Sequence, residues 1–390
     1  MSEAYIVEAV RTAGGRRKGA LAGWHPADLA GQVLNAIVDR SGVDPAAIED
    51  VIMGCVGQVG QQSFLVARNA IFASKLPQSV PGTTVDRQCG SSQQAVHFAA
   101  QAVMSGAQDL VIAAGVESMT RVPMLSPTTL ALEAGLGGPW SERVLERFGV
   151  AEFSQFHGAE AMVEKYGFSR EELDAFALLS HQRAARATHE GAFEAEIVPV
   201  EIQDAHGETM LHTKDEGIRY DASLGAMASV KTVREGGYIT AANASQICDG
   251  ASGVLVASAR AVKAHGLKPL ARIHQLHVHA GDPVIMLEEP IPGTTRALEK
   301  AGMKMSDIDL YEVNEAFAPV PLAWLKVLDA DAEKLNVHGG AIALGHPLGS
   351  SGAKLMATLV HALHRRGKRY GLQTMCEGGG MANVTIIERL

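Results

Sequence analysis

Cysteine is scarce in this chain of 390 residues, which contains Cys55, Cys89, Cys248 and Cys376. The four are too widely spaced to suggest a disulfide framework or a CxxC metal site, and we predict no bound metal. Free thiols persist in a reducing compartment, so we expect a cytoplasmic protein. The sequence also lacks an apolar run of about 18 residues, so no membrane-spanning helix is expected.

Positive charge and aromatic side chains are also limited. Lys and Arg number 34 against 43 Asp and Glu, the formal net charge is −9, and aromatic residues make up 5%. Such a chain lacks the basic surface that nucleic acid or an anionic membrane requires, so neither is expected to be a partner. Local cations must then bind any anionic ligand. The hydrophobic content of 47% is typical of an α/β protein with a large core.

The stretch around Cys89 is the strongest candidate for chemistry. Alanines and apolar residues recur at helical spacing over residues 93–103, so Cys89 is expected just before or within the first turn of a largely buried helix. The free N–H groups and the positive end of the helix dipole should lower the pKa of the thiol and favour the nucleophilic thiolate. The alternative is a small apolar cysteine in the core, and partners elsewhere in the chain must decide.

Two glycine-framed stretches near the C-terminus supply candidate partners. His346 lies between glycines, in a predicted turn that opens a small-residue helix. Cys376 ends an apolar strand, and after Glu377 come three glycines whose backbone N–H groups are free to bind an anion. Two thiols and one imidazole at glycine-framed turns favour a catalytic site over core packing.

The two ends of the chain resemble each other. Residues 41–51 are similar to residues 301–311, an offset of 260 (301 − 41), and Gly90-Ser91-Ser92 recurs as Gly349-Ser350-Ser351 at an offset of 259 (349 − 90). A nearly constant offset predicts a duplication in which each half is a strand-helix unit with a mostly parallel sheet. The first thiol and the histidine then occupy equivalent places, so we expect a site between the halves.

Local patterns predict individual elements. Residues 26–41 have the pattern of an amphipathic helix, and residues 109–115 form an apolar run typical of a strand buried on both faces. Residues 119–245 have a sequence pattern that differs from that of the two halves on either side. It includes a capped, charged helix pattern at 169–190 and a polar hairpin pattern at 198–214. A long insertion between core strands is usually a lid or a ligand-binding subdomain.

Four stretches together carry a resemblance to a known family. Cys89, Asn314-Glu315-Ala316-Phe317, Gly345-His346-Pro347 and Cys376-x-Gly-Gly-Gly resemble the corresponding stretches of the thiolases, which make or break a carbon–carbon bond beside a coenzyme A thioester. Within the family the chain is similar to the degradative 3-ketoacyl-CoA thiolases, a group that includes steroid-degrading relatives. The resemblance extends over essentially the whole chain.

The resemblance implies a five-layered α-β-α-β-α fold with two duplicated halves and an inserted loop domain. The N-terminal half would comprise residues 1–118 and 246–265, the C-terminal half residues 266–390, and the loop domain that holds coenzyme A residues 119–245. Acyl-CoA and coenzyme A would be the ligands, with coenzyme A as co-substrate and no permanently bound cofactor. The chain would form a homodimer or homotetramer.

The same resemblance implies roles at the site. Cys89 would be the nucleophile that becomes acylated, and His346 would accept its proton and then help to hold an enolate oxygen. Asn314 would fix a water molecule on that oxygen, and Cys376 would move the proton at carbon two. The N–H groups of Cys89 and Gly378 would form a second oxyanion site, each contributing about 3 kcal/mol.

Five further residues fall where the family contacts its ligands: His157, Arg219, Ser245, Met286 and Phe317. They are predicted to bind coenzyme A or the acyl group. For Arg219 an ordinary surface arginine is an equally good interpretation.

The chain also departs from the family. Many members have Met-Gly-x-Gly-Pro where this chain has Met286-Leu287-Glu288-Glu289-Pro290, and an apolar residue where Glu377 follows Cys376. Carboxylates near the expected acyl pocket suggest a bulkier or partly polar acyl group, such as an intermediate of ring degradation. If the Glu377 carboxylate lies near Cys376, it should raise the pKa of that thiol.

The interpretation that follows is thiolytic cleavage of a 3-ketoacyl-CoA through an acyl-cysteine intermediate. A biosynthetic acetoacetyl-CoA thiolase, which condenses two acetyl-CoA molecules, would use the same residues. A non-catalytic acyl-CoA or lipid-binding scaffold is the alternative from another class, and retention of both thiols with His346 argues against it. A carrier-protein ketosynthase would usually show two histidines rather than His346 and Cys376.

Overall fold

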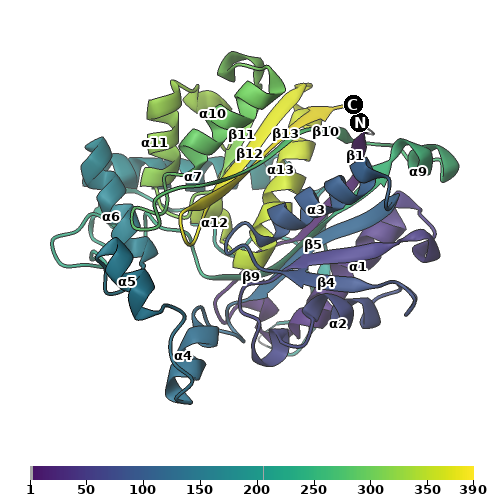
Figure 1. Cartoon of the computed structure of the whole chain (residues 1–390), viewed down its shortest axis with the longest axis horizontal. Helices are drawn as coiled ribbons and strands as arrows, with labels where there is room; N and C mark the ends of the chain where they lie inside the picture. The colour runs from purple at the N-terminus through teal and green to yellow at the C-terminus, as the bar shows by residue number, and fades with distance from the viewer. Residues whose placement is uncertain (1–2, 205) are drawn as a thin grey trace.

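A computed structural model describes residues 3–204 and 206–390 as a mixed α/β fold around one large sheet (Figure 1). The sheet has eleven strands, whose main path runs β11-β12-β13-β10-β1-β9-β5-β3-β4, with β2 beside β9 and β6 beside β1. An N-terminal and a C-terminal group of strands meet where β1 pairs with β10, through Tyr5 opposite Arg272 and Ile6 opposite Ala271. The strands are β1 (Ala4–Thr12), β2 (Gly15–Arg16), β3 (Asp50–Gly54), β4 (Gly82–Val85), β5 (Leu110–Ser118), β6 (Ile197–Val198), β9 (Cys248–Ser258), β10 (Ala271–Ala280), β11 (Leu310–Val313), β12 (Tyr370–Glu377) and β13 (Met381–Arg389).

Helices cover the outer faces of the two strand groups and fill the space between them. α3 and α13 pack against each other in the middle, and α13 contacts β1 and β9 of one group and β11 and β12 of the other. α1 and α2 lie on the far side of the N-terminal strands, and α10 and α11 on the far side of the C-terminal strands (Figure 1). The layers alternate α-β-α-β-α, which confirms the predicted layers. The predicted mostly parallel sheet is wrong, because six of the ten strand pairings of the large sheet are antiparallel. The helices of these layers are α1 (Pro26–Ser41), α2 (Val66–Phe72), α3 (Ser91–Ser105), α10 (Pro290–Ala301), α11 (Pro319–Leu328) and α13 (Ser351–Arg365), joined by the short α9 (Ala259–Ala264) and α12 (Ala341–Leu344).

Strand β5 shows how the sequence produces two buried faces. Leu110 and Ile112 pack into the core beneath α1, whereas Val111 and Ala113 pack into the core around α3 and α13. Because side chains alternate along a strand, an apolar run without polar interruption can fill both cores. All nine residues of β5 are buried, which confirms the strand predicted from residues 109–115.

Helix α1 has the predicted bounds of residues 26–41, and its ends follow from local chemistry. The His25 ring accepts a hydrogen bond from the Ala27 N–H at 3.3 Å, and Pro26 occupies the first helical position, where no N–H is needed. Gly42 ends the helix with a φ of +69°, a left-handed conformation that favours glycine.

In the segment between the core strands, α4, α5 and α6 lie together at one side of the molecule (Figure 1). Strand β7 of the same segment instead packs on the 3-10 helix η1 (Ala20–Gly23) beside the N-terminal core. Ser169 and Glu172 form a reciprocal capping box at the start of α7, and β7 pairs antiparallel with β8, so both patterns predicted in this segment are confirmed. Its elements are α4 (Ser126–Glu133), α5 (Glu142–Phe148), α6 (Gln155–Tyr166), α7 (Arg170–His189), β7 (Val200–Gln203), β8 (Thr209–His212) and α8 (Leu224–Ala228).

A buried ion network ties this segment to the core. The Arg11 guanidinium, fully buried on β1, contacts Glu196 at 2.5 Å and Asp215 at 2.8 Å. Asp215 also accepts a hydrogen bond from the Gly14 N–H at 2.8 Å, and the neighbouring guanidinium lowers its pKa. Removing one member would leave an unpaired buried charge, which is strongly destabilising.

The predicted repeat corresponds to equivalent local structure. The 3-10 helix η2 (Pro45–Ala47) leads into β3, and η4 (Met305–Asp307) leads into β11 in the same way. The repeated Gly-Ser-Ser stretches lie at the starts of α3 and α13, side by side in the middle layer. The domain boundaries at residues 118/119, 245/246 and 265/266 stay a prediction.

Three further observations concern the described part of the chain. No helix in residues 3–204 and 206–390 is both long and apolar enough to cross a membrane. Within the same residues, His, Cys, Asp and Glu side chains form no group of three or more that could hold a metal ion. All four cysteines are free and buried.

Candidate active site

Cys89 lies in the turn between β4 and α3, two residues before the helix begins, as predicted. The preceding residue, Gln88, has a φ of +49°, which is uncommon for a residue with a side chain. The Ser91 hydroxyl supports this turn, because it accepts a hydrogen bond from the Arg87 N–H at 3.0 Å and donates one to the Gln88 carbonyl at 2.6 Å. The turn thus fixes the direction in which the thiol points.

The thiol of Cys89 is buried, and burial raises its pKa to about 12. The Glu377 carboxylate contributes to this rise, whereas the backbone N–H groups of Cys89 and Gly378 oppose it. The predicted lowering of this pKa by the helix terminus is therefore wrong, because loss of water around the sulfur outweighs the two backbone donors. At neutral pH Cys89 is a thiol that needs a base to become a nucleophile.

Cys376 is brought next to Cys89 by the end of β12. Burial raises the pKa of its thiol well above the usual range, and the nearby Cys89 and Glu377 raise it further. The two sulfurs, 287 residues apart in the sequence (376 − 89), are therefore close enough to interact electrostatically. The effect of Glu377 on the pKa of Cys376 has the predicted sign.

The glycines after Cys376 allow a close approach of backbone to the thiol turn. A Cβ on Gly378 would lie 3.0 Å from Oε1 of Gln88, and a Cβ on Gly380, whose φ is +75°, would lie 2.6 Å from the Asp282 carbonyl. Gly378 therefore lies directly against Gln88 of the thiol turn, and its N–H reaches the sulfur of Cys89.

His346 lies between α12 and α13, and a hydrogen-bond chain fixes its tautomer. The Ser351 hydroxyl donates to the Pro347 carbonyl at 2.9 Å, so it accepts the Nδ1 proton of His346 at 2.5 Å. Nε2 then carries the free lone pair and faces Nδ2 of Asn314 at 3.4 Å. Burial, with the Lys354 ammonium, lowers the pKa of His346 to about 3, so the imidazole is neutral.

The Asn314 side chain faces the His346 imidazole, and its backbone is bonded to the strand that carries the second thiol. Its N–H donates to the Thr374 carbonyl at 3.1 Å, so it directly follows β11 beside the part of β12 that ends in Cys376. Its side chain lies almost completely buried. The amide therefore sits between the histidine turn and the strand that carries Cys376.

The thiol turn and the histidine turn meet where α3 and α13 begin. The Ser92 hydroxyl accepts a hydrogen bond from the Ala353 N–H at 2.9 Å, and a Cβ on Gly352 would lie 2.0 Å from the backbone nitrogen of Gln93. Gly352 thus permits direct backbone contact between the two helices. This junction lies between the two halves, where the sequence predicts the site.

Ser351 and the Glu377 contacts are features that sequence reasoning missed. Ser351 was visible only as part of the repeat, although a serine in the first helical turn after Gly-His-Pro could have indicated a partner for the imidazole. Glu377 accepts a hydrogen bond from the Asn383 N–H at 3.0 Å, and a Cβ on Gly90 would lie 1.8 Å from its Oε1. Burial raises the pKa of Glu377 to about 8, against the opposing effect of Arg87.

The predicted ligand residues divide between two places. Arg219 lines a cavity of about 180 Å³ beside α8, together with Ser223, Met227, Val230 and Gln246. Ser245 precedes Gln246 and donates its N–H to the Ala316 carbonyl at 2.9 Å.

The other three ligand candidates cluster near α6, outside the lining of that cavity. His157 is exposed on α6, and its neighbour Phe156 packs edge-to-face against Phe317 with ring centroids 5.4 Å apart. Met286 is buried with a φ of +61°, and a Cβ on Gly158 of α6 would lie 3.5 Å from its Cβ.

Glu288 and Glu289, which depart from the family pattern, are both bound by other groups of this chain. Glu288 forms an ion pair with Lys165 at 2.7 Å and accepts a hydrogen bond from the Tyr166 hydroxyl at 2.9 Å. Glu289 is buried, accepts a hydrogen bond from the Asp282 N–H at 3.2 Å and lies 3.4 Å from His279. Both carboxylates therefore hold the start of α10 against its neighbours.

Comparisons with known proteins agree with this geometry. The family model of the thiolase N-terminal domain matches residues 4–260, and that of the thiolase C-terminal domain matches residues 267–389. The chain is 54% identical over 392 residues to a steroid 3-ketoacyl-CoA thiolase, FadA6, of Mycobacterium tuberculosis, covering 100% of this chain and 95% of that protein. It is 41% identical over 401 residues to a beta-ketoadipyl-CoA thiolase of Escherichia coli, covering 100% of both.

A solved structure shares the whole architecture. Human mitochondrial 3-ketoacyl-CoA thiolase superimposes with a TM-score of 0.89 at 36% identity, covering 100% of this chain and 99% of that one. Sequence and structure thus agree over the full length, and the chain belongs to the thiolase family of acyltransferases.

Proposed function

We propose that this chain cleaves 3-ketoacyl-CoA with coenzyme A, giving acetyl-CoA and a shortened acyl-CoA through an acyl-cysteine intermediate. The observation that carries the proposal is the meeting of two buried thiols beside the Gly378 N–H, with the neutral His346 imidazole at the same junction of α3 and α13. Thiolytic cleavage needs a nucleophile, a base, an acid and an oxyanion site, and this set supplies all four.

The reaction is proposed to start with proton transfer from Cys89 to Nε2 of His346, the nitrogen with the free lone pair. The sulfur attacks the keto carbon, and the oxyanion accepts hydrogen bonds from the N–H groups of Cys89 and Gly378. The bond between carbons two and three then breaks, and its electron pair forms the enolate of acetyl-CoA. His346 and a water molecule on Asn314 hold the enolate oxygen, and Cys376 gives its proton to carbon two.

The second half-reaction transfers the acyl group to coenzyme A. The thiol of coenzyme A gives its proton to Cys376, attacks the acyl-Cys89 thioester and releases the Cys89 thiolate, which takes back from Nε2 of His346 the proton that it gave in the first half-reaction. The raised pKa of Cys89 fits this sequence, because a thiol with a pKa of about 12 must lose its proton to a base as it attacks. Coenzyme A is thus proposed as co-substrate, with no resident cofactor.

Coenzyme A is proposed to bind over the cavity beside α8. Arg219 supplies a cation for its phosphates, which an acidic protein must provide locally, and Met227 and Val230 supply apolar walls. Ser245 is proposed to contact the pantetheine arm, and His157 to contact it from α6. Phe317 and Met286 would then lie nearer to the acyl group.

The acyl group is proposed to be bulky or cyclic. The relative that is 54% identical is named a steroid 3-ketoacyl-CoA thiolase, and this likeness supports the proposal. Glu288 and Glu289 do not support it, because other groups of the chain bind both carboxylates. Measuring kcat/KM for acetoacetyl-CoA, a medium-chain 3-ketoacyl-CoA and a cyclic 3-ketoacyl-CoA tests it. A clear preference for the straight chains would overturn it.

A homodimer or homotetramer is also proposed. Strand β4 lies at the edge of the sheet, and near it Phe64 and Phe72 are 91% and 61% exposed. An open strand edge beside exposed aromatic side chains favours burial against a second copy. Light scattering after size-exclusion chromatography should give at least twice the mass of one chain, and a monomer would contradict the proposal.

Mass spectrometry tests the catalytic proposal. After incubation with acetyl-CoA, the protein should gain one acetyl group on Cys89, and Cys89→Ala should gain none there. A folded protein without the adduct would favour a non-catalytic acyl-CoA-binding scaffold. Turnover of acetyl-CoA to acetoacetyl-CoA that exceeds thiolysis of all longer substrates would instead favour a biosynthetic thiolase.

A further inference from the structure

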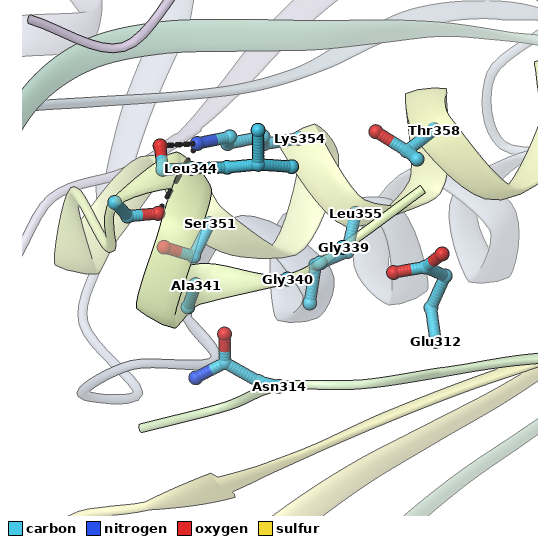
Figure 2. A pocket seen from close by; sticks show the side chains of 11 residues that line it. Glu312, Asn314, Gly339, Gly340, Ala341, Leu344, Ser351, Lys354, Leu355 and Thr358 are labelled. Atoms are coloured by element: carbon cyan, nitrogen blue, oxygen red, sulfur yellow. Dashed lines mark hydrogen bonds between the residues drawn. The ribbon is translucent and has the colours of Figure 1, made fainter. Parts of the chain in front are cut away.

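A buried lysine contacts the turn that contains His346. Lys354 is the fourth residue of α13, and its ammonium donates hydrogen bonds to the carbonyls of Leu344 and Gly345 at 2.6 and 3.1 Å (Figure 2). The last carbonyls of a helix have no partner within the helix, and α12 ends at Leu344. Because residues 341–347 are buried, a side chain takes the place of bulk water at these carbonyls.

The peptide unit that joins Gly345 to His346 is hydrogen-bonded at both ends. Its carbonyl, that of Gly345, accepts from Lys354 at 3.1 Å, and its N–H, that of His346, donates to the Gln246 carbonyl at 3.0 Å. Gly345 also packs tightly against Cys248, because a Cβ on Gly345 would lie 2.6 Å from Sγ of that cysteine. The two hydrogen bonds set the plane of this peptide unit, and with it the direction in which the imidazole leaves the backbone.

An acidic group supports a charged lysine at this buried position. Burial lowers the pKa of Lys354, and Asp215 opposes this lowering most strongly. Asp215 also lies near one of the carbonyls that the lysine binds, because a Cβ on Gly14 would lie 2.8 Å from the Leu344 oxygen and 3.2 Å from Oδ1 of Asp215. The ion network that ties β1 to the inserted segment therefore also places a carboxylate beside this ammonium.

We propose that Lys354 is a positioning residue for His346: its ammonium holds the Gly345-His346 peptide unit so that Nε2 of the imidazole faces Asn314. These two side chains are 3.4 Å apart, from Nε2 to Nδ2. Without the lysine, the Gly345 carbonyl loses its donor and the peptide unit can rotate, which moves the imidazole away from the proton of Cys89. A small displacement of a reacting group lowers the rate strongly. The kinetic consequence rests on the proposed function, whereas the geometry does not.

Two substitutions at position 354 test the inference. Lys354→Met keeps a long unbranched side chain but removes every N–H, so it should lower kcat about tenfold with KM unchanged. Lys354→Arg keeps the charge and the donors, and a small cavity lined by Lys354 and Leu355 leaves space for the larger guanidinium (Figure 2). This variant should keep kcat within about threefold.

Lys334→Met is the matched control. The Lys334 side chain is partly buried, and its ammonium donates to the Ile308 carbonyl at 2.9 Å, outside the proposed site. Its loss should leave kcat and KM unchanged. Crystal structures of the unaltered protein and of both variants at position 354 complete the test. The Gly345-His346 peptide unit should rotate in Lys354→Met and keep its orientation in Lys354→Arg.

Three results would overturn the inference: a kcat for Lys354→Met equal to or above that of the unaltered protein, an equal loss in both variants, or an unchanged peptide unit in Lys354→Met. If circular dichroism shows that the methionine variant does not fold, Lys354→Arg decides. Its guanidinium should bind both carbonyls with kcat retained, and a tenfold loss of kcat or missing hydrogen bonds would refute the inference. If the unaltered protein has no thiolase activity, the proposed function fails separately, and the crystal structures alone decide whether Lys354 holds the peptide unit.

Discussion

Replacing Glu377 by Gln should make the protein more stable at alkaline pH than the unaltered chain. Burial raises the pKa of Glu377 to about 8, from an ordinary value of 4.5. Between these values the folded protein holds a proton that the unfolded chain has lost. Stability from this group is therefore fully present below pH 4.5 and is lost as the pH rises toward 8.

The size of the effect follows from the width of that window. The window covers about 3.5 pH units, each worth about 1.4 kcal/mol, so the full loss is about 5 kcal/mol, of which about 3 to 4 kcal/mol falls between pH 5 and pH 8. The amide that replaces the carboxyl group does not titrate. The free energy of unfolding of the variant minus that of the unaltered protein should therefore increase by about 3 to 4 kcal/mol from pH 5 to pH 8.

Urea unfolding of both proteins at pH 5, 6, 7 and 8 measures this difference. Glu235→Gln, which removes an exposed carboxylate, is the matched control and should give a curve parallel to that of the unaltered protein. A parallel curve for Glu377→Gln would refute the reasoning, because it would mean that the folded environment does not disfavour the charged form.

The same substitution should change the reactivity of the site. The Glu377 carboxylate raises the pKa of both Cys89 and Cys376, so an uncharged amide should lower both. Alkylation by iodoacetamide, followed by mass spectrometry of each cysteine, should be faster in Glu377→Gln at pH 9. An unchanged rate would show that burial alone sets the two pKa values.

Three further substitutions test other contacts. Ser351→Ala should lower kcat about tenfold at similar KM, because the imidazole loses the acceptor that fixes its tautomer, and an unchanged kcat would refute this role. Gly90→Ala should destabilise by about 1–3 kcal/mol in urea unfolding, because the new Cβ would collide with Glu377, and Gly90→Ala combined with Glu377→Ala should recover stability if that collision is the cause. Lys165→Ala should cost less than about 1 kcal/mol, because its ion pair with Glu288 is half exposed, and a larger loss in thermal unfolding would assign this pair more than a surface role.

The high pKa of Cys89 bears on how the site resists damage as well as how it reacts. Thiolates, rather than thiols, are alkylated and oxidised, so a buried neutral thiol is protected until substrate and base are in place. Above about pH 8, where Glu377 becomes a carboxylate, it adds to this protection by disfavouring a negative charge on both sulfurs. The cost is a dependence on the neutral His346 as base.

The helix at residues 26–41 and the strand around residues 109–115 could be predicted from the sequence alone, because periodicity and capping depend on neighbours in the chain. The layered fold and the candidate site residues were predicted from the resemblance of four short stretches to the thiolases. The repeat placed the first thiol and His346 at equivalent positions, and this was sufficient to expect a site between the halves.

Only the tertiary structure decided the chemistry of those residues. The pKa of Cys89 moved in the opposite direction to the prediction, because burial and Glu377, which is 288 residues away (377 − 89), outweigh the local helix terminus. The tautomer of His346 depends on the Ser351 hydroxyl, and the engagement of Glu288 depends on Lys165 of α6. Desolvation and pairing are set by which distant segments pack together, so they could not be predicted from the order of residues along the chain.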